Sequence, residues 1–232
     1  MRIADEEGFT LIELILSLAI GGMVLAATVV MLTTGMSSAR ASDDRTESTQ
    51  RARLGFDQIT RLIGAQVCNG VGNAGSPVVA GDKDHVFFTA NTGRADDDPI
   101  GYELRYEPST NELWEYQYAL TGAENPAGYK AWATTPMKSL QLLSRVIGQS
   151  GVNVFRYFGT DDAATGAPVE LKPDGSSLSD TERPRVLRID LALRVLPERS
   201  QTLDDQGATV MTTQNYVTSN IVNGSLDQGP RC

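Results

Sequence analysis

The stretch of sequence that decides the fold lies near the start of the chain and reads GFTLIELILSLAIGGMVLAATVVML, residues 8–32. Between Glu13 and Arg40 no residue is charged, and the 26 residues Leu14–Ala39 would form a helix about 39 Å long. The hydrocarbon core of a bilayer is about 30 Å thick, so a helix of this length can span it. We therefore predict a membrane-spanning helix.

A cleaved secretory signal peptide is the competing interpretation. Ala39-Arg40-Ala41 resembles its cleavage site, and a cut there would leave a chain beginning at Ser42. However, the apolar run is longer than the hydrophobic region of such peptides, which has about 7–15 residues. The residues before it are also acidic rather than basic. We therefore favour a retained helix.

One carboxylate, Glu13, lies at the edge of the apolar run, within the string Gly8-Phe9-Thr10-Leu11-Ile12-Glu13-Leu14. A charge at the centre of a membrane span costs about 2.5–3.5 kcal/mol, and less near an interface. A carboxylate retained at that cost is a candidate functional residue. Taken alone, it fits equally well with a simple marker of where the membrane begins.

This string, followed by an apolar helix, resembles the class III signal of type IV pilins and type II secretion pseudopilins. The resemblance implies that a prepilin peptidase cuts between Gly8 and Phe9 and then methylates the new amino terminus. Gly8 and Phe9 are then the processing residues. Glu13 is expected to act in assembly, by neutralising the amino terminus of its own or a neighbouring chain, because an unpaired charge in an apolar filament core is costly.

We expect four regions in the chain. They are a leader peptide (1–8), the transmembrane and filament-core half of a long helix (9–39), the amphipathic second half of that helix (40–67) and a β-rich globular head (68–232). The residues of the second half that share an apolar face are Ala52, Phe56, Ile59, Leu62, Ile63 and Val67. This face is predicted to pack on the head, whereas Arg53, Asp57 and Arg61 are predicted to be solvated.

The predicted fold class is α+β, with the long helix packed on a mostly antiparallel sheet. Alternating apolar and aromatic residues predict strands at His85–Ala90, Tyr102–Glu107, Glu112–Tyr118, Val152–Phe158, Val186–Leu196 and Thr209–Thr218. A short helix is predicted at Met137–Ile147, and loops at Asn91–Pro99, Thr121–Gly128 and Gly159–Thr181. This order loosely resembles the larger minor pilins and J-class pseudopilins.

Composition argues against several classes of function. The net charge of −9 does not favour general nucleic-acid binding. The single histidine, His85, and the two cysteines are too few for a usual zinc site, and the chain has no G-x-S-x-G motif. We therefore predict no enzymatic activity and no cofactor. Calcium at Asp96–Asp98 with Asp161–Asp162 is the less favoured alternative, because three adjacent acids cannot all face one ion.

Two further patterns are assigned to structure. Residues 70–75 match G-x-G-x-x-G, but they follow a predicted helix rather than a strand, so we expect a connector. The aromatic residues Trp114, Tyr116, Tyr118 and Trp132 are expected in the core of the sheet, with an aromatic ligand face as the alternative.

The two cysteines, Cys68 and Cys232, are predicted to form a disulfide. The head is expected outside the cytoplasm, where disulfides persist, and no other cysteine competes. The alternative is a buried Cys68 and a free terminal thiol.

Together these observations predict a structural subunit, a minor pilin or pseudopilin, that is a single-pass membrane protein before it enters an extracytoplasmic filament. Its expected partners are prepilin peptidase, other pilin or pseudopilin subunits, a membrane assembly platform and the lipid bilayer. A head that is a binding module for a surface, a secreted protein or DNA is the alternative. The sequence leaves open whether the machine is a pilus, a secretion system or a DNA-uptake apparatus.

Overall fold

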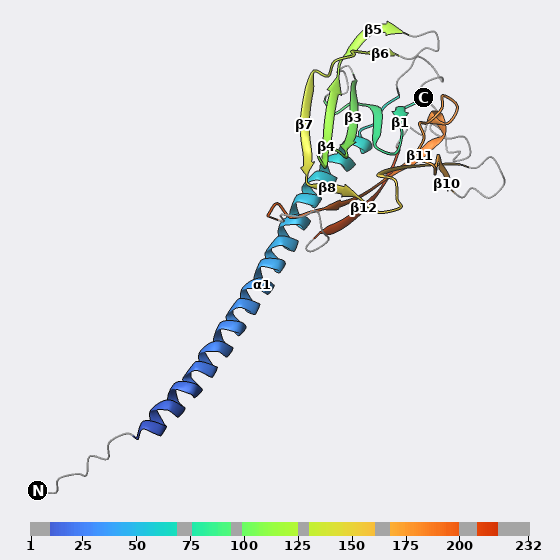
Figure 1. Cartoon of the computed structure of the whole chain (residues 1–232). Coiled ribbons are helices and arrows are strands. Elements are labelled where there is room, and N and C mark those ends of the chain that lie inside the picture. Colours follow the sequence, from blue (N-terminus) through green and yellow to red (C-terminus); the bar gives the residue numbers. More distant parts are fainter. Residues whose placement is uncertain are drawn as a thin grey trace, which may run out of the picture. The chain divides into compact units, whose positions relative to one another are not determined.

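A computed structural model describes residues 10–68, 76–93, 99–124, 130–160, 168–199 and 208–217 (Figure 1). The chain divides into two compact units, and the boundary along the sequence falls between Asp44 and Arg45. One helix, α1 (Leu11–Gly64), runs through this boundary and contributes to both units. It ends at Gly64 rather than at residue 67, because Gln66 already forms a β-bridge with Ala90.

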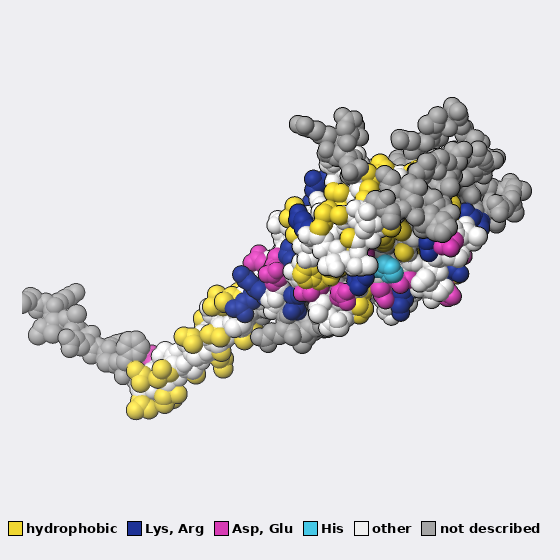
Figure 2. Space-filling view, turned by 90° about the horizontal axis from the view of Figure 1, so that it is seen from above, with side chains coloured by type: hydrophobic (Ala, Val, Ile, Leu, Met, Phe, Trp, Pro, Cys, Tyr) yellow, Lys and Arg dark blue, Asp and Glu magenta, His cyan; other side chains and the backbone are white. Residues whose placement is uncertain are grey.

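The first unit contains the apolar part of α1. Every described side chain from residue 10 to residue 43 is exposed, and hydrophobic side chains cover much of this part of the helix in Figure 2. By length and composition, α1 is the one described helix that could cross a membrane, with a mean hydropathy of 2.4 in its most apolar window. A helix that is apolar on all sides needs lipid or other helices around it.

The second unit contains the rest of α1 together with all the strands. The buried side of this part of the helix comprises Ser48, Ala52, Gly55, Phe56, Ile59, Leu62 and Ile63. The predicted apolar face is thereby confirmed within the helix. Arg53, Asp57 and Arg61 are exposed, as predicted.

The first sheet has five antiparallel strands in the order β1-β2-β3-β4-β7. Their bounds are Val78–Gly81 for β1, His85–Ala90 for β2, Ile100–Glu107 for β3, Glu112–Tyr118 for β4 and Lys138–Ser144 for β7. The neighbouring hairpin pairs β5 (Leu120–Glu124) with β6 (Lys130–Trp132).

The second sheet has the order β10-β9-β11-β12, and β8 pairs with β11 as well. Its strands are β8 (Val146–Gly148), β9 (Phe155–Thr160), β10 (Pro168–Leu171), β11 (Val186–Val195) and β12 (Thr209–Tyr216). A short 3-10 helix, η2 (Arg183–Arg185), precedes β11. All pairings between described strands are antiparallel.

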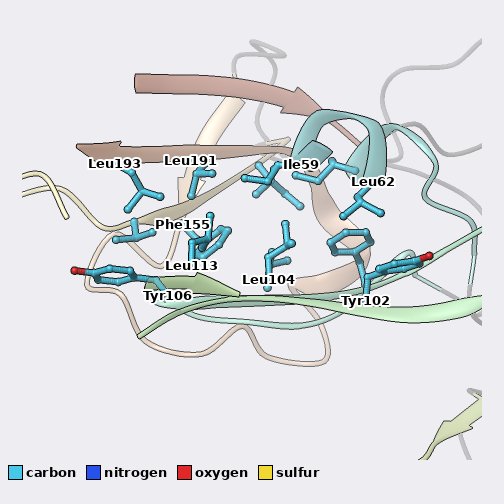
Figure 3. Close-up of a cluster of buried hydrophobic side chains, with 14 of the residues drawn as sticks. Ile59, Leu62, Tyr102, Leu104, Tyr106, Leu113, Phe155, Leu191 and Leu193 are labelled. Carbon is cyan, nitrogen blue, oxygen red and sulfur yellow. The ribbon is translucent and has the colours of Figure 1, made fainter. Parts of the chain in front are cut away.

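The hydrophobic core of the head lies where the two sheets and α1 meet. Figure 3 shows side chains of all three pointing toward one another: Ile59 and Leu62 from α1, Leu104 and Leu113 from the first sheet, and Phe155, Leu191 and Leu193 from the second. Gly55 lets α1 approach β7 closely, because a Cβ atom there would lie 2.7 Å from Cγ of Leu143. The predicted α+β class is confirmed.

One predicted element is wrong. The segment Met137–Ile147 is not a helix but forms β7 and most of β8. Its leucines, lysine and glutamine favour a helix by local propensity, but the segment pairs with β4 and β11 instead, and tertiary pairing overrides propensity. The predicted loops Thr121–Gly128 and Gly159–Thr181 are also wrong in part, since they contain most of β5 and all of β10.

Candidate processing and assembly site

The first turn of α1 is closed by a reciprocal pair of side chains, Thr10 and Glu13. The backbone N–H and the hydroxyl of Thr10 each donate to Oε2 of Glu13 at 3.0 Å. In return, the backbone N–H of Glu13 lies 3.4 Å from Oγ1 of Thr10 and 3.1 Å from its carbonyl oxygen. This is a capping box, in which the residue before the helix and the third helical residue satisfy each other's free N–H groups.

The capping box leaves one oxygen of Glu13 available. Both hydrogen bonds that the carboxylate accepts from described residues end on Oε2, so Oε1 receives none from them. A carboxylate accepts several hydrogen bonds at once. Glu13 can therefore cap its own helix and still receive a cationic group.

Five hydroxyl side chains of the apolar segment find a partner within the helix itself. Each donates its hydroxyl to a backbone carbonyl three or four residues earlier, at 2.8–3.0 Å: Ser17, Thr28, Thr33, Thr34 and Ser37. In hydrocarbon, where no water is present, each polar group needs such an internal partner. Sequence reasoning missed this feature, although the signal was there in serines and threonines set among apolar residues.

Several predicted sites fall outside the described residues. Gly8 and Phe9, the two sides of the expected cut, precede them, and the calcium candidates Asp96–Asp98 and Asp161–Asp162 lie in gaps, as do residues 70–75. In the described part of the chain no cluster of three or more His, Cys, Asp or Glu residues could hold a metal ion. Cys68 is half-buried just after α1, and Cys232 is not described, so the disulfide stays a prediction.

The aromatic residues of β4 were predicted to lie in the core of the sheet, but they do not. Since side chains alternate along a strand, Leu113 and Glu115 are buried on one side, whereas Trp114, Tyr116 and Tyr118 are half-buried on the other. Trp114 stacks on Tyr116 with ring centroids 6.2 Å apart. The prediction of an aromatic sheet core is therefore wrong for these three residues.

An exposed apolar helix that continues as the core helix of a two-sheet head defines a class of protein: an α+β subunit whose first helix suggests membrane anchoring. Residues 4–29 match the family model of the prokaryotic N-terminal methylation motif, so the chain carries the signal of type IV pilins and pseudopilins. No curated protein and no solved structure matches the chain.

Proposed function

We propose that this chain is a minor pilin or pseudopilin, a structural subunit that is cut after Gly8 and assembled into a filament through the first half of α1. The observation that carries the proposal is the methylation motif at residues 4–29. It coincides with a helix start whose capping residue, Glu13, keeps one carboxylate oxygen available. The exposed apolar side chains that follow supply the surface for lipid and for neighbouring helices.

Glu13 has two roles in this proposal. In the membrane it caps α1 through Thr10. In the filament its carboxylate also pairs with the amino group of Phe9, from its own chain or from a neighbouring one. An unpaired charge in an apolar core is strongly destabilising, so such pairing would select one register between subunits.

The partners follow from these roles. Prepilin peptidase processes the chain, a membrane assembly platform moves it out of the bilayer, and other pilin or pseudopilin subunits surround α1. The head, residues 68–232, lies outside the cytoplasm. The alternative function, a head that binds a ligand, is favoured by the cavity described in the next subsection.

The test of the assembly role compares Glu13→Ala with Glu13→Gln. Glutamine also serves at the third position of a capping box, so Glu13→Gln keeps the cap and removes only the charge. Both variants are expected to be processed, because the scissile bond is unchanged, and both are expected to be depleted from sheared filaments. The readout is the ratio of filament-bound to membrane-bound subunit.

Glu13→Gln decides between the two roles. If it enters filaments as well as the unmodified chain while Glu13→Ala does not, capping alone explains Glu13 and the charge-pairing role is wrong. Normal incorporation of both variants would remove Glu13 from assembly altogether.

A further inference from the structure

A cavity of about 500 Å³ lies between the last turns of α1 and the first sheet. Its polar lining residues include Gln58, Arg61, Asn91, Thr92, Tyr102 and Glu115. Leu62, in the last turn of α1, and Ala65, which directly follows the helix, add an apolar wall. Pockets for small ligands are typically about 300–1,000 Å³, so the cavity is large enough to hold one.

Glu115, on β4, is the most unusual group in this lining. Its side chain is almost fully buried, with 1% of the residue exposed. Its carboxylate accepts hydrogen bonds from two neutral amides: Nε2 of Gln117 donates to Oε1 at 2.7 Å, and Nε2 of Gln58 donates to Oε2 at 3.3 Å. No ion pair joins it to any residue that the structure describes.

The other buried acids of the head show what Glu115 lacks. Glu103, 6% exposed, is paired with Arg105, and Asp190, 1% exposed, lies 2.8 Å from Nε of Arg188. Burying a carboxylate is costly unless a cation and hydrogen bonds compensate it. Glu115 has the hydrogen bonds, but among the described residues it has no cation.

The arginine that lines the cavity, Arg61, is hydrogen-bonded to Gln58 rather than paired with Glu115. The guanidinium of Arg61 donates to Oε1 of Gln58 at 2.8 Å and to the carbonyl oxygen of Asp57 at 3.4 Å. The amide of Gln58 thus stands between the two charges and turns its Nε2 toward Glu115. Among the described residues, no cation takes the place of a counter-ion beside Glu115.

We propose that this cavity binds a primary alkylammonium group, with Glu115 as its counter-ion. Each carboxylate oxygen already accepts one amide N–H, which hinders the two parallel hydrogen bonds that a guanidinium makes with a carboxylate. A compact ammonium needs only one direction of approach. The hydroxyls of Thr92 and Tyr102, 2.7 Å apart, offer further acceptors, and Leu62 and Ala65 accommodate the alkyl chain.

A primary alkylammonium group has two natural sources: a free amine, or the side chain of a lysine in another protein chain. The experiment titrates the full mature chain, in detergent micelles and with ¹⁵N-labelled glutamine, with n-pentylammonium and separately with Nα-acetyl-lysine methylamide. The side-chain amide signals of Gln58 and Gln117 are expected to shift saturably. 1-Pentanol, the neutral analogue, is expected to cause no shift. Tighter binding of the lysine derivative would indicate a protein partner, and tighter binding of pentylammonium a free amine.

Two variants test the role of Glu115. Glu115→Gln keeps the shape and is expected to weaken binding at least tenfold. The matched control is Glu112→Gln, on the same strand but outside the lining, which is expected to bind as the unmodified chain does. Ala65→Met places a larger side chain at the apolar wall of the cavity and is expected to abolish binding. It tests the proposal independently if Glu115→Gln folds poorly. Unchanged affinity in Glu115→Gln or Ala65→Met, or no saturable shift in the unmodified chain, would overturn the proposal.

Discussion

Tyr157, in β9, shows how a single buried hydroxyl ties the two sheets together. The residue is 2% exposed, and its hydroxyl lies 2.7 Å from the carbonyl oxygen of His85 and 3.0 Å from that of Asp82. Gly81 makes room for the ring, because a Cβ atom there would lie 2.5 Å from the hydroxyl oxygen. Burial raises the pKa of the Tyr157 hydroxyl well above its ordinary value.

This raised pKa predicts a loss of stability in alkali. In the unfolded chain Tyr157 ionises near pH 10, whereas in the folded chain it stays protonated, so the unfolded state binds fewer protons above that pH. The stabilisation is therefore complete below about pH 10 and falls by about 1.4 kcal/mol per pH unit above it, until the pH reaches the folded pKa. Urea unfolding of the full chain in detergent, followed by tryptophan fluorescence between about pH 8 and 11, measures it.

Tyr157→Phe is expected to lessen the alkaline fall without removing it, because burial also raises the pKa values of Tyr106, Tyr116 and Tyr118. It is also expected to lower stability at neutral pH by about 1–3 kcal/mol, since buried carbonyl groups lose a donor. The control is Tyr216→Phe, because Tyr216 is 65% exposed. An alkaline slope that is the same in Tyr157→Phe as in the unmodified chain would show that other groups cause it.

At the scale of elements, the contact of α1 with β7 depends on a glycine in the middle of a helix. Gly55→Ala would place its Cβ atom 2.7–2.9 Å from three carbon atoms of the Leu143 side chain. Leu143 is only 3% exposed, so it has little room to move away. Alanine favours a helix by about 1 kcal/mol over glycine, but overpacking a core costs about 1–3 kcal/mol. We expect the overpacking to prevail and the free energy of unfolding to fall.

The matched control for this prediction is Gly64→Ala, at the end of the same helix, where an added Cβ atom meets no atom within 4 Å. It is expected to leave stability unchanged or to raise it by up to about 1 kcal/mol. Chemical denaturation of both variants compares them directly. Equal effects of the two substitutions on the free energy of unfolding would mean that the close approach of α1 to Leu143 does not require a glycine at position 55.

The elements that sequence predicts best are those whose local pattern matches their final environment. β2 and β4 have the predicted bounds, because their side chains alternate between two sides of a sheet. β7 was missed, since its pairing partner, β4, is distant in the chain and its composition favours a helix. The pattern of β4 did not reveal which of its two sides faces α1. For this reason Trp114 was expected in the core and Glu115 was not singled out.

At the candidate site, the cost of placing a charge beside an apolar helix made Glu13 a candidate, and the resemblance to the class III signal gave it an expected role in assembly. It did not foresee the capping box with Thr10, although a threonine three residues before a glutamate is the known pattern. The cavity at Glu115 could not be predicted from sequence, because α1 and the first sheet come together only in the folded head.

At the scale of the whole molecule, the predicted disulfide between Cys68 and Cys232 would join the end of the long helix to the end of the chain. It would close a loop of roughly 160 residues, and the chain-entropy model puts the upper limit of its stabilisation at about 5 kcal/mol. Thiol labelling of the purified, unfolded chain is expected to modify both cysteines only after reduction. Two reactive thiols without reductant would show that the bond is absent.

The expected cut between Gly8 and Phe9 is the central prediction, because residues 4–29 carry the signal of type IV pilins and pseudopilins. The most direct test is the N-terminal sequence and intact mass of the protein from membranes of cells with active prepilin peptidase. We expect a chain that begins at Phe9 and carries one additional methyl group on its amino terminus. A chain that begins at Ser42, or one that retains Met1–Gly8, would contradict the account.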